Sequence, residues 1–229
     1  TSFHEPLTTL SFLAAVTQRL EFITTILILP QRQTVLVAKQ AAQVAILSEN
    51  RFRLGVGSGW NEIEYEGLNE NFRNRGKRQA EQVELMRKLW ASDSLTYKGQ
   101  FHTINKASLK PRPDTTIPVW FGGSAPALLK RCAELGDGWI PLMGANQMAK
   151  KCIETLKRHR EEAGLSWGSF GIQAQAQYAG GNPDRWKSHA EKWEAMGCTH
   201  LAIATHNAEK TNVPGHLRRV EEYLEATTV

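Results

Sequence analysis

Residues 118–142 read PVWFGGSAPALLKRCAELGDGWIPL, and this stretch decides the fold. A short apolar run at its start ends in two glycines. Residues with helical spacing follow as far as Leu135, and a second apolar run begins at Trp139. Strand, helix and strand in this order, with short connections, predict one βα unit that leads into the next strand of a parallel sheet.

The same alternation extends in both directions from this stretch. Strands are predicted at 21–29, 51–56, 118–121, 139–142, 170–178 and 199–205. Helices are predicted at 6–19, 34–47, 61–67, 75–90, 124–135, 147–163, 184–196 and 213–226. Each of the six strands is followed by a helix, which indicates an α/β fold whose parallel sheet is either doubly wound or closed as a barrel.

One segment breaks the alternation. Residues 95–113 contain a Lys98-Gly99 turn between two strand-like runs, which predicts a hairpin excursion. No linker or low-complexity stretch interrupts the remainder, so we interpret residues 1–229 as one domain. With 41% hydrophobic and 22% charged residues, the composition is that of a globular protein and excludes disordered and disulfide-stapled classes.

Charge and cysteine usage narrow the function further. The net charge is +5, and the basic residues of 150–160 alternate with glutamates, so a solvated helix is favoured over a nucleic-acid surface.

Cys132, Cys152 and Cys198 form no C-x-x-C pair, and the histidines lack ligand spacing, so no metal site is predicted. No membrane span or secretory leader is visible, and we expect a cytoplasmic protein.

Residues 55–60 read GVGSGW at the end of a predicted strand. A dinucleotide fingerprint requires G-x-G-x-x-G, and Trp60 occupies the last glycine position, so a Rossmann loop is disfavoured. Glycines at a strand end do allow a flat ligand to approach the backbone closely, although a plain turn explains them as well.

The Gly122-Gly123-Ser124-Ala125-Pro126 turn is the other glycine-rich strand end. We expect Ser124 to cap the helix that follows, with Pro126 in its first turn. A helix start with bare glycines before it suits a phosphate group, and an ordinary cap is the alternative. No G-x-S-x-G elbow or paired carboxylates at strand ends occur, and no catalytic residue is predicted.

Four segments stand out in order along the chain, namely LEFITTILILP, TVLVAKQAAQVAILSENRFRLGVGSGW, LMRKLW and LKPRPDTTIPVWFGGSAPALLKRCAELGDGWIP. Together they resemble the luciferase-like family, the group that contains bacterial luciferase and oxidoreductases using the deazaflavin coenzyme F420. The resemblance implies a TIM (β/α)₈ barrel in which the six visible βα units are strands three to eight. The first strand, first helix and second strand would then be missing from this chain, which begins at Thr1.

The resemblance also implies which residues form the cofactor site. The strand ending at Leu29 matches one that often carries a non-prolyl cis peptide, here Thr25–Ile26. Ser58 stands where luciferase has an arginine, which removes one charge partner of the phosphate. The implied cofactor-binding residues are Thr25, Ile26, Gly57, Ser58, Gly122, Gly123, Ser124, Ala125, Trp139 and Ile140.

The function implied is that of a flavin- or deazaflavin-dependent oxidoreductase or monooxygenase acting on a small organic substrate. The sequence motifs GVGSGW and GDGWIP favour F420 slightly over FMN as the cofactor. A homodimer is expected, with a flavin reductase or F420-reducing protein as a further partner. Two alternatives stay open, namely a non-catalytic flavin-binding protein and a barrel enzyme that binds a sugar phosphate.

Overall fold

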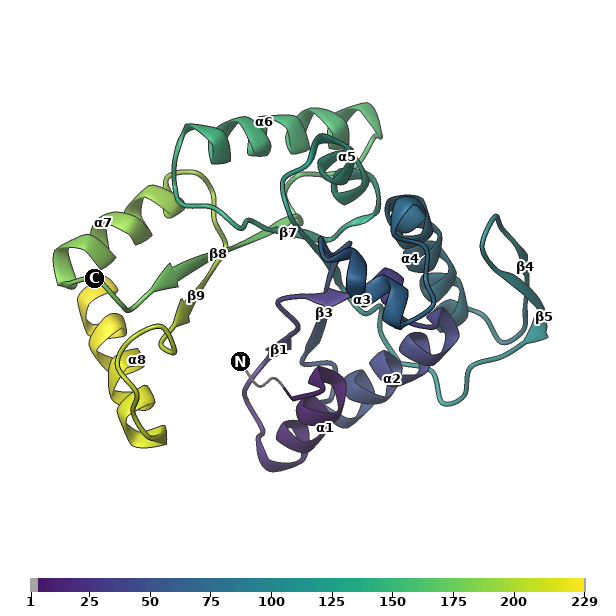
Figure 1. The fold of residues 1–229 in the computed structure, drawn as a ribbon, viewed down its shortest axis with the longest axis horizontal. Helices are drawn as coiled ribbons and strands as arrows, with labels where there is room; N and C mark the ends of the chain where they lie inside the picture. Colours follow the sequence, from purple (N-terminus) through teal and green to yellow (C-terminus); the bar gives the residue numbers. More distant parts are fainter. Residues whose placement is uncertain (1–3, 229) are drawn as a thin grey trace.

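The computed structural model of this chain describes residues 4–228, and its main sheet is parallel and curls into an open arc (Figure 1). The strands of this sheet are β1 (Phe22–Ile23), β2 (Leu27–Ile28), β3 (Phe52–Gly57), β6 (Val119–Gly122), β7 (Gly138–Ile140), β8 (Gly171–Gln177) and β9 (His200–Ala204). Their order is β1-β3-β6-β7-β8-β9, with β2 also beside β3. Because each strand lies next to its predecessor in the chain and the order never reverses, the sheet is part of a barrel and is not doubly wound.

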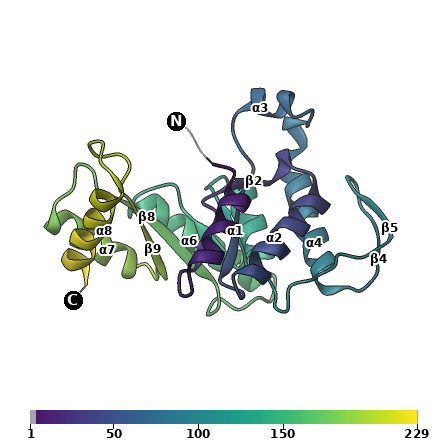
Figure 2. The same cartoon turned by 90° about the horizontal axis from the view of Figure 1, so that it is seen from below.

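Helices cover the convex side of the sheet, apart from one short helix that lies beyond the carboxyl end of β3 (Figures 1 and 2). They are α1 (Pro6–Val16), α2 (Thr34–Leu47), α3 (Glu62–Gly67), α4 (Arg75–Ala91), α5 (Pro126–Leu135), α6 (Gln147–Glu162), α7 (Pro183–Glu194) and α8 (Val213–Thr227), with 3₁₀ turns η1 (Leu29–Gln31) and η2 (Phe72–Asn74). The first helix ends three residues earlier than predicted, because Thr17 is already extended. No helix among residues 4–228 combines the length and apolar character needed to cross a membrane.

The strand predicted over 21–29 is wrong as one continuous element. It forms two short strands, β1 and β2, and the Thr25–Ile26 peptide bond between them is cis, as the resemblance implies. Phe22 pairs with Phe52 and Leu27 pairs with Val56, so this side carries one more residue than β3. The extra residue makes a bulge, which a continuous β-branched run does not reveal.

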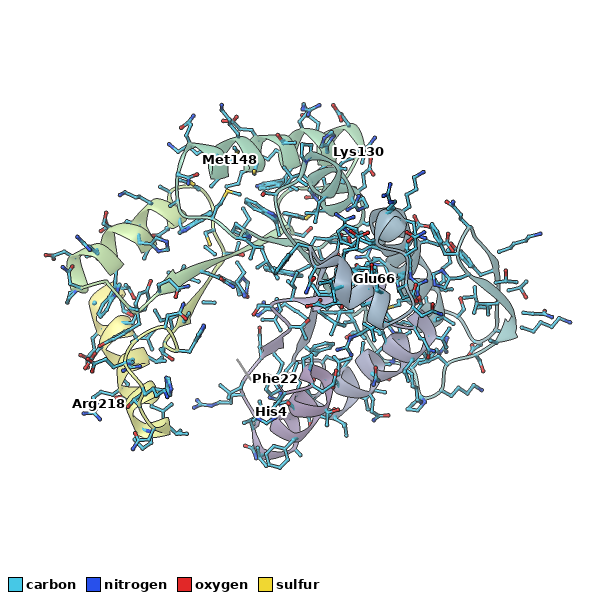
Figure 3. The ribbon with its side chains drawn as sticks, in the orientation of Figure 1. His4, Phe22, Glu66, Lys130, Met148 and Arg218 are labelled. Atoms are coloured by element: carbon cyan, nitrogen blue, oxygen red, sulfur yellow. The ribbon has the colours of Figure 1, made fainter. Side chains whose placement is uncertain are left out.

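Alternate residues of the strands face two different environments. The outward side chains, such as Val119 and Phe121, join the buried side chains of the helices in one apolar core. Lys130 and Met148 lie on the outer helices α5 and α6, away from that core (Figure 3). The inward side chains of the curled sheet line its concave side, where the candidate site lies.

The predicted excursion is a two-stranded antiparallel hairpin, β4 (Leu95–Lys98) with β5 (Thr103–Ala107), which projects beyond α4 (Figure 1). Glu81 of α4 holds its loop, since its carboxylate accepts hydrogen bonds from the backbone N–H groups of Gln100, Phe101 and His102 and bonds the His102 ring. Burial opposes ionisation here, but these hydrogen bonds outweigh it and hold the pKa of the Glu81 carboxyl below its usual range.

Candidate functional site

A hollow of about 420 Å³ opens where β2, β3 and β6 reach their carboxyl ends. This is the end of a parallel barrel at which ligands bind. We call it the mouth pocket. Its lining residues are Ile26, Ile28, Ser58, Gly59, Trp60, Arg75, Gly76, Gly122, Gly123, Ser124, Ala125, Ala127, Leu128, Arg131 and Leu142. Six of the ten residues implied by the resemblance lie together in this lining.

Ile26 forms the floor of the mouth pocket because two glycines make room for it. A Cβ atom on Gly57 would lie 1.8 Å from Ile26 Cδ1, and one on Gly122 would lie 2.8 Å from Ile26 Cγ2. Any side chain larger than hydrogen at either position would therefore displace Ile26. The branched side chain of Ile26 therefore lies over the glycine ends of β3 and β6, and it forms an apolar ledge in the pocket.

The β3 end of the pocket is fixed by hydrogen bonds from the elements behind it. Ser58 Oγ donates to Gln79 Oε1 over 2.9 Å, and the Tyr65 hydroxyl donates to the Ser58 carbonyl over 2.5 Å. Burial raises the pKa of Tyr65 to about 12, against the opposing effect of Arg75, so the phenol stays a donor at neutral pH. Ser58 is thus oriented by side chains of α3 and α4.

The β6–α5 turn forms the opposite wall, and one prediction about it is wrong. Ser124 is not the N-cap of α5, because Ala125 occupies that position and makes no side-chain capping bond. Gly123 has a φ of +125°, which turns the chain so that Ser124 and Ala125 stand exposed at the rim. The Ser124 hydroxyl is therefore not used as a cap.

Two arginines that sequence reasoning missed complete the pocket. Arg75 begins α4, where its Nε donates to the Gly59 carbonyl over 3.3 Å and its guanidinium stacks 3.7 Å from the centre of the Phe72 ring. Arg131 lies on α5, and its Nε is buried without a hydrogen-bond partner. Burial lowers the pKa of Arg131, and the charge of Arg75 lowers it further. Within residues 4–228, neither arginine has a carboxylate within 4.0 Å.

A weak signal for one of these arginines was present in the sequence. Residues 75–78 read RGKR at the start of a predicted helix, and α4 has no acidic residue in its first turn. Cations at a helix N-terminus oppose the helix dipole, so their presence there calls for a purpose other than helix stability. Arg131 gave no comparable signal, since it follows Lys130 on an ordinary amphipathic helix.

Four of the implied residues do not line the mouth pocket. Thr25 is exposed outside it, and Gly57 is buried beneath Ile26. Ile140 is buried against Gly55 on the concave side, and Trp139 is buried in the core on the convex side. Trp139 supports the pocket from behind, because its Nε1 donates to the Gly123 carbonyl over 2.7 Å and so holds the β6–α5 turn.

Comparisons with known proteins agree with this architecture. An uncharacterised protein of Mycobacterium tuberculosis is 44% identical over 153 residues, which cover 66% of this chain and 52% of that protein. F420-dependent glucose-6-phosphate dehydrogenase of Amycolatopsis mediterranei is 34% identical over 153 residues, covering 64% and 46%. The chain thus spans about half the length of the curated relatives it matches.

The fold is shared with solved structures at low sequence identity. Monooxygenase RslO1 from Streptomyces bottropensis superimposes with a TM-score of 0.85 at 17% identity, covering 99% of this chain and 85% of that one. The model of the family described as luciferase-like monooxygenase matches residues 1–227. The chain belongs to the luciferase-like monooxygenase family.

Proposed function

We propose that this chain is part of an oxidoreductase that binds F420 or FMN in the mouth pocket and acts on a small organic substrate. The observation that carries the proposal is the pair Arg75 and Arg131, two cations without a carboxylate partner beside a bare glycine turn. A phosphate group supplies the negative charge that both arginines lack and a hydrogen-bond acceptor for Arg131. The two arginines also replace the charge lost by the serine at position 58.

The rest of the pocket suits a flat ring system attached to that phosphate. The ledge formed by Ile26 over Gly57 and Gly122 is apolar and lies in the same pocket as Arg75 and Arg131. When bound, the cofactor ring supplies the redox chemistry, as hydride transfer for the deazaflavin or activation of oxygen for FMN. Arg75 and Arg131 would hold the phosphate, and Ile26 would provide an apolar surface for the ring.

F420 is favoured over FMN as the cofactor. The glycine and tryptophan motifs at residues 55–60 and 136–141 resemble the deazaflavin-using members, and one similar relative is described as F420-dependent. A separate reductase would regenerate the reduced cofactor. In the sugar-phosphate alternative, Arg75 and Arg131 would bind the phosphate in the same way, but the apolar ledge of Ile26 would have no flat ring to contact.

The test is a titration of the purified protein with F420 and with FMN, followed by cofactor fluorescence. Arg131→Ala is expected to weaken cofactor binding about 10- to 100-fold, because it removes a charge-assisted contact with about 1.5–3 kcal/mol of net stabilisation. Lys130→Ala, the same charge change on the exposed side of α5, is the control and should leave affinity unchanged. Equal effects of the two substitutions would contradict the phosphate assignment.

We further propose that the protein forms a homodimer through the outer side of α1. The alanines of α2, namely Ala38, Ala41, Ala42 and Ala45, are buried within the protomer, so they are not available for it. On and just after α1, by contrast, Phe12, Val16 and Leu20 are each at least 60% exposed. Sedimentation should give a dimer for the wild type and a monomer for Phe12→Asp, with Thr8→Asp on the same helix as the control.

A further inference from the structure

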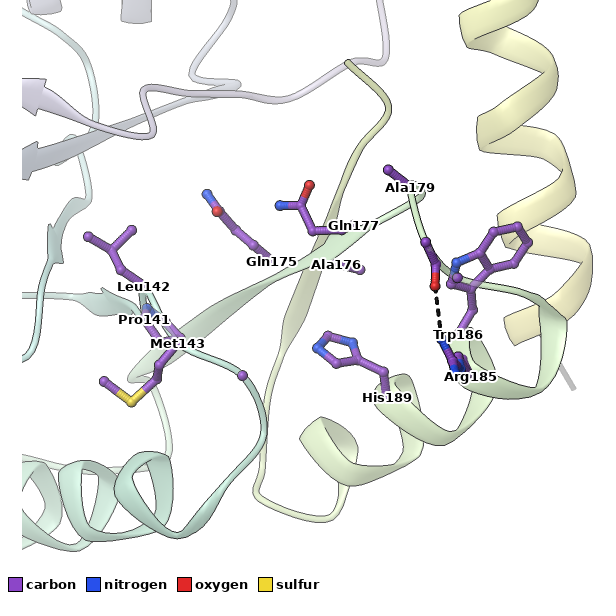
Figure 4. Close-up of a pocket in the computed structure, with 13 residues that line it drawn as sticks. Pro141, Leu142, Met143, Gln175, Ala176, Gln177, Ala179, Arg185, Trp186 and His189 are labelled. Carbon is purple, nitrogen blue, oxygen red and sulfur yellow. Dashed lines mark hydrogen bonds between the residues drawn. The ribbon is translucent and has the colours of Figure 1, made fainter. Parts of the chain in front are cut away.

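A second hollow, of about 450 Å³, lies beside the mouth pocket (Figure 4). Its walls are the loop after β7 (141–144), the end of β8, the turn at 179–181 and the first two turns of α7. We call it the β8 pocket. Leu142 lines both this pocket and the mouth pocket, so ligands in the two would meet at that side chain.

His189 lines this pocket and carries a ring nitrogen without a hydrogen-bond partner. Its Nε2 lies 3.2 Å from Trp193 Nε1, and because an indole nitrogen can only donate, the histidine nitrogen must be the acceptor. The neutral ring therefore carries its proton on Nδ1. That atom is buried and has no hydrogen-bond partner. A buried N–H without an acceptor is rare, since the unmade hydrogen bond costs about 1–3 kcal/mol.

Trp186 presents a second unpartnered donor. Its side chain is more than nine-tenths buried, and its Nε1 has no hydrogen-bond partner. Figure 4 shows the nitrogen edge of the indole on the side that faces the other lining residues. The turn covers this nitrogen, since a Cβ atom on Gly181 would lie 2.0 Å from Nε1, so Trp186 forms a wall of the pocket and is not counted among the donors to a ligand.

The charges around the β8 pocket are mainly positive. Arg185 lines it, and its Nη1 donates to the Gly180 carbonyl over 3.1 Å and has no carboxylate within 4.0 Å among the described residues. The lining includes no aspartate or glutamate. A smaller adjoining hollow shares Arg185 and His189 and adds Lys192 and one carboxylate, Asp184. Among the charged side chains of the two hollows, the cations Arg185 and Lys192 thus exceed the single carboxylate, which favours an anion.

We propose that the β8 pocket binds an oxyanion, the carboxylate or phosphate group of the substrate, with Arg185 and His189 as its main donors. Identifying the anion as part of the substrate rests on the proposed function, because it assumes a cofactor on the other side of Leu142. That the pocket binds an oxyanion does not rest on it. The chain thus recognises a substrate that carries an acid group on one side of its reactive carbon.

The first test is a calorimetric titration with inorganic phosphate and, separately, with acetate. At least one of the two should bind the wild type, and Arg185→Ala should weaken that binding at least tenfold, while Arg185→Lys keeps part of it. Lys187→Ala removes the same charge from the exposed side of α7 and should have no effect. Failure of both ions to bind, or equal binding to Arg185→Ala, would overturn the proposal.

The second test follows the ring signals of His189 by NMR at increasing pH. Burial lowers the pKa of His189, and the charge of Lys192 lowers it further. An anion hydrogen-bonded to Nδ1 stabilises the protonated ring and should raise this pKa, whereas an anion bound elsewhere would leave it unchanged. The fixed charges of Arg185, Lys192 and Asp184 are the same with and without the added ion, so the difference reports the ion.

A crossed comparison separates this proposal from the proposed function. Arg185→Ala should leave the affinity for F420 or FMN unchanged, and Arg131→Ala should leave the calorimetric response of the β8 pocket unchanged. If the chain binds neither cofactor but still binds phosphate through Arg185, only the proposed function fails. If Arg185→Ala weakens cofactor binding instead, the anion belongs to the cofactor and the substrate assignment is wrong.

Discussion

The two ends of the curled sheet treat charge in opposite ways. At the carboxyl end, Arg75 and Arg131 stand in the mouth pocket without a carboxylate partner among the described residues. At the amino end, Arg53 of β3 has partners for both terminal nitrogens: its Nη1 lies 2.6 Å from His200 Nε2, its Nη2 lies 3.1 Å from Glu21, and its guanidinium lies over Trp120, although its Nε is unpartnered.

Tryptophan and glycine are also arranged differently at the two ends. Trp120 lies across Gly138 and Gly171 at the amino end, and Cβ atoms there would fall 2.3 and 2.2 Å from its indole ring. At the carboxyl end, Trp60 is 85% exposed at the rim of the mouth pocket. Glycines at both ends thus make room for a side chain of the protein, Trp120 at the amino end and Ile26 at the carboxyl end, but only the indole at the amino end is buried.

Under the proposed function, the amino end stabilises the fold and the carboxyl end binds the cofactor, a division typical of barrel enzymes. Unpaired cations are unfavourable for folding, so they are kept where a ligand supplies the missing charge. The comparison leads to a testable prediction. Substitutions at the amino end should change stability and not affinity, and substitutions in the mouth pocket should do the reverse.

The largest effect is expected for Trp120→Ala. Removing a 4% exposed indole from between two glycines leaves a cavity that the bare backbone cannot fill. The free energy of unfolding should fall by about 3–5 kcal/mol, as is usual for truncation of a buried aromatic side chain. Urea denaturation of the purified chain measures it.

Trp60→Ala is the matched control for Trp120→Ala, since it makes the same chemical change at an 85% exposed position. Its unfolding free energy should stay within about 0.5 kcal/mol of the wild type. Because Trp60 lines the mouth pocket, Trp60→Ala can change the affinity for the cofactor, which is measured separately. Comparable destabilisation by both substitutions would remove the distinction between the two ends.

Arg53→Met is expected to have the next largest effect. Methionine keeps the apolar stem of the side chain, but it loses the hydrogen bond with His200, the ion pair with Glu21 and the stacking of the guanidinium on Trp120. Because Glu21 is largely exposed, that ion pair contributes little, and most of the expected loss of about 1–3 kcal/mol comes from the hydrogen bond and the stacking.

The same substitution should not change cofactor affinity, and Arg131→Ala should give the opposite pattern. Measuring both variants by urea denaturation and by cofactor titration tests the comparison directly. A loss of cofactor affinity in Arg53→Met that matches the loss in Arg131→Ala would show that the two ends are not independent.

Much of this architecture followed from the sequence. The alternation of strands and helices and the hairpin at 95–113 were predictable, because hydrophobic periodicity and turn residues are local signals. The clustering of Ser58 with Gly122–Ala125 was implied by the family resemblance. The cis bond at Thr25–Ile26 was predictable from the family resemblance alone. The choice between a barrel and a doubly wound sheet was not local, and it depended on the order of the strands in space.

What could not be predicted depends on contacts between distant segments. The bulge that divides residues 21–29 is set by pairing with β3, where Gly55 lets the Thr24 carbonyl approach. Arg75 and Arg131 are 56 positions apart, and only the packing of α4 beside α5 brings both to one pocket. Ser124 was expected as a cap by residue type, but the left-handed conformation of Gly123 moves the helix start beyond it.

The smallest predicted effect concerns pH and again separates the two ends. Burial lowers the pKa of His200, and the charge of Arg53 lowers it further, while Glu21 raises it. Arg53 donates to Nε2, so the neutral ring carries its proton on Nδ1, 2.8 Å from the Thr199 hydroxyl. The folded state therefore favours neutral His200. Its contribution to stability is complete above the unfolded pKa of about 6.5 and declines as the pH falls below that value. Unfolding free energies at pH 7.5 and 5.5 should differ less in His200→Gln than in the wild type, and an equal pH dependence in both would show that another group is responsible.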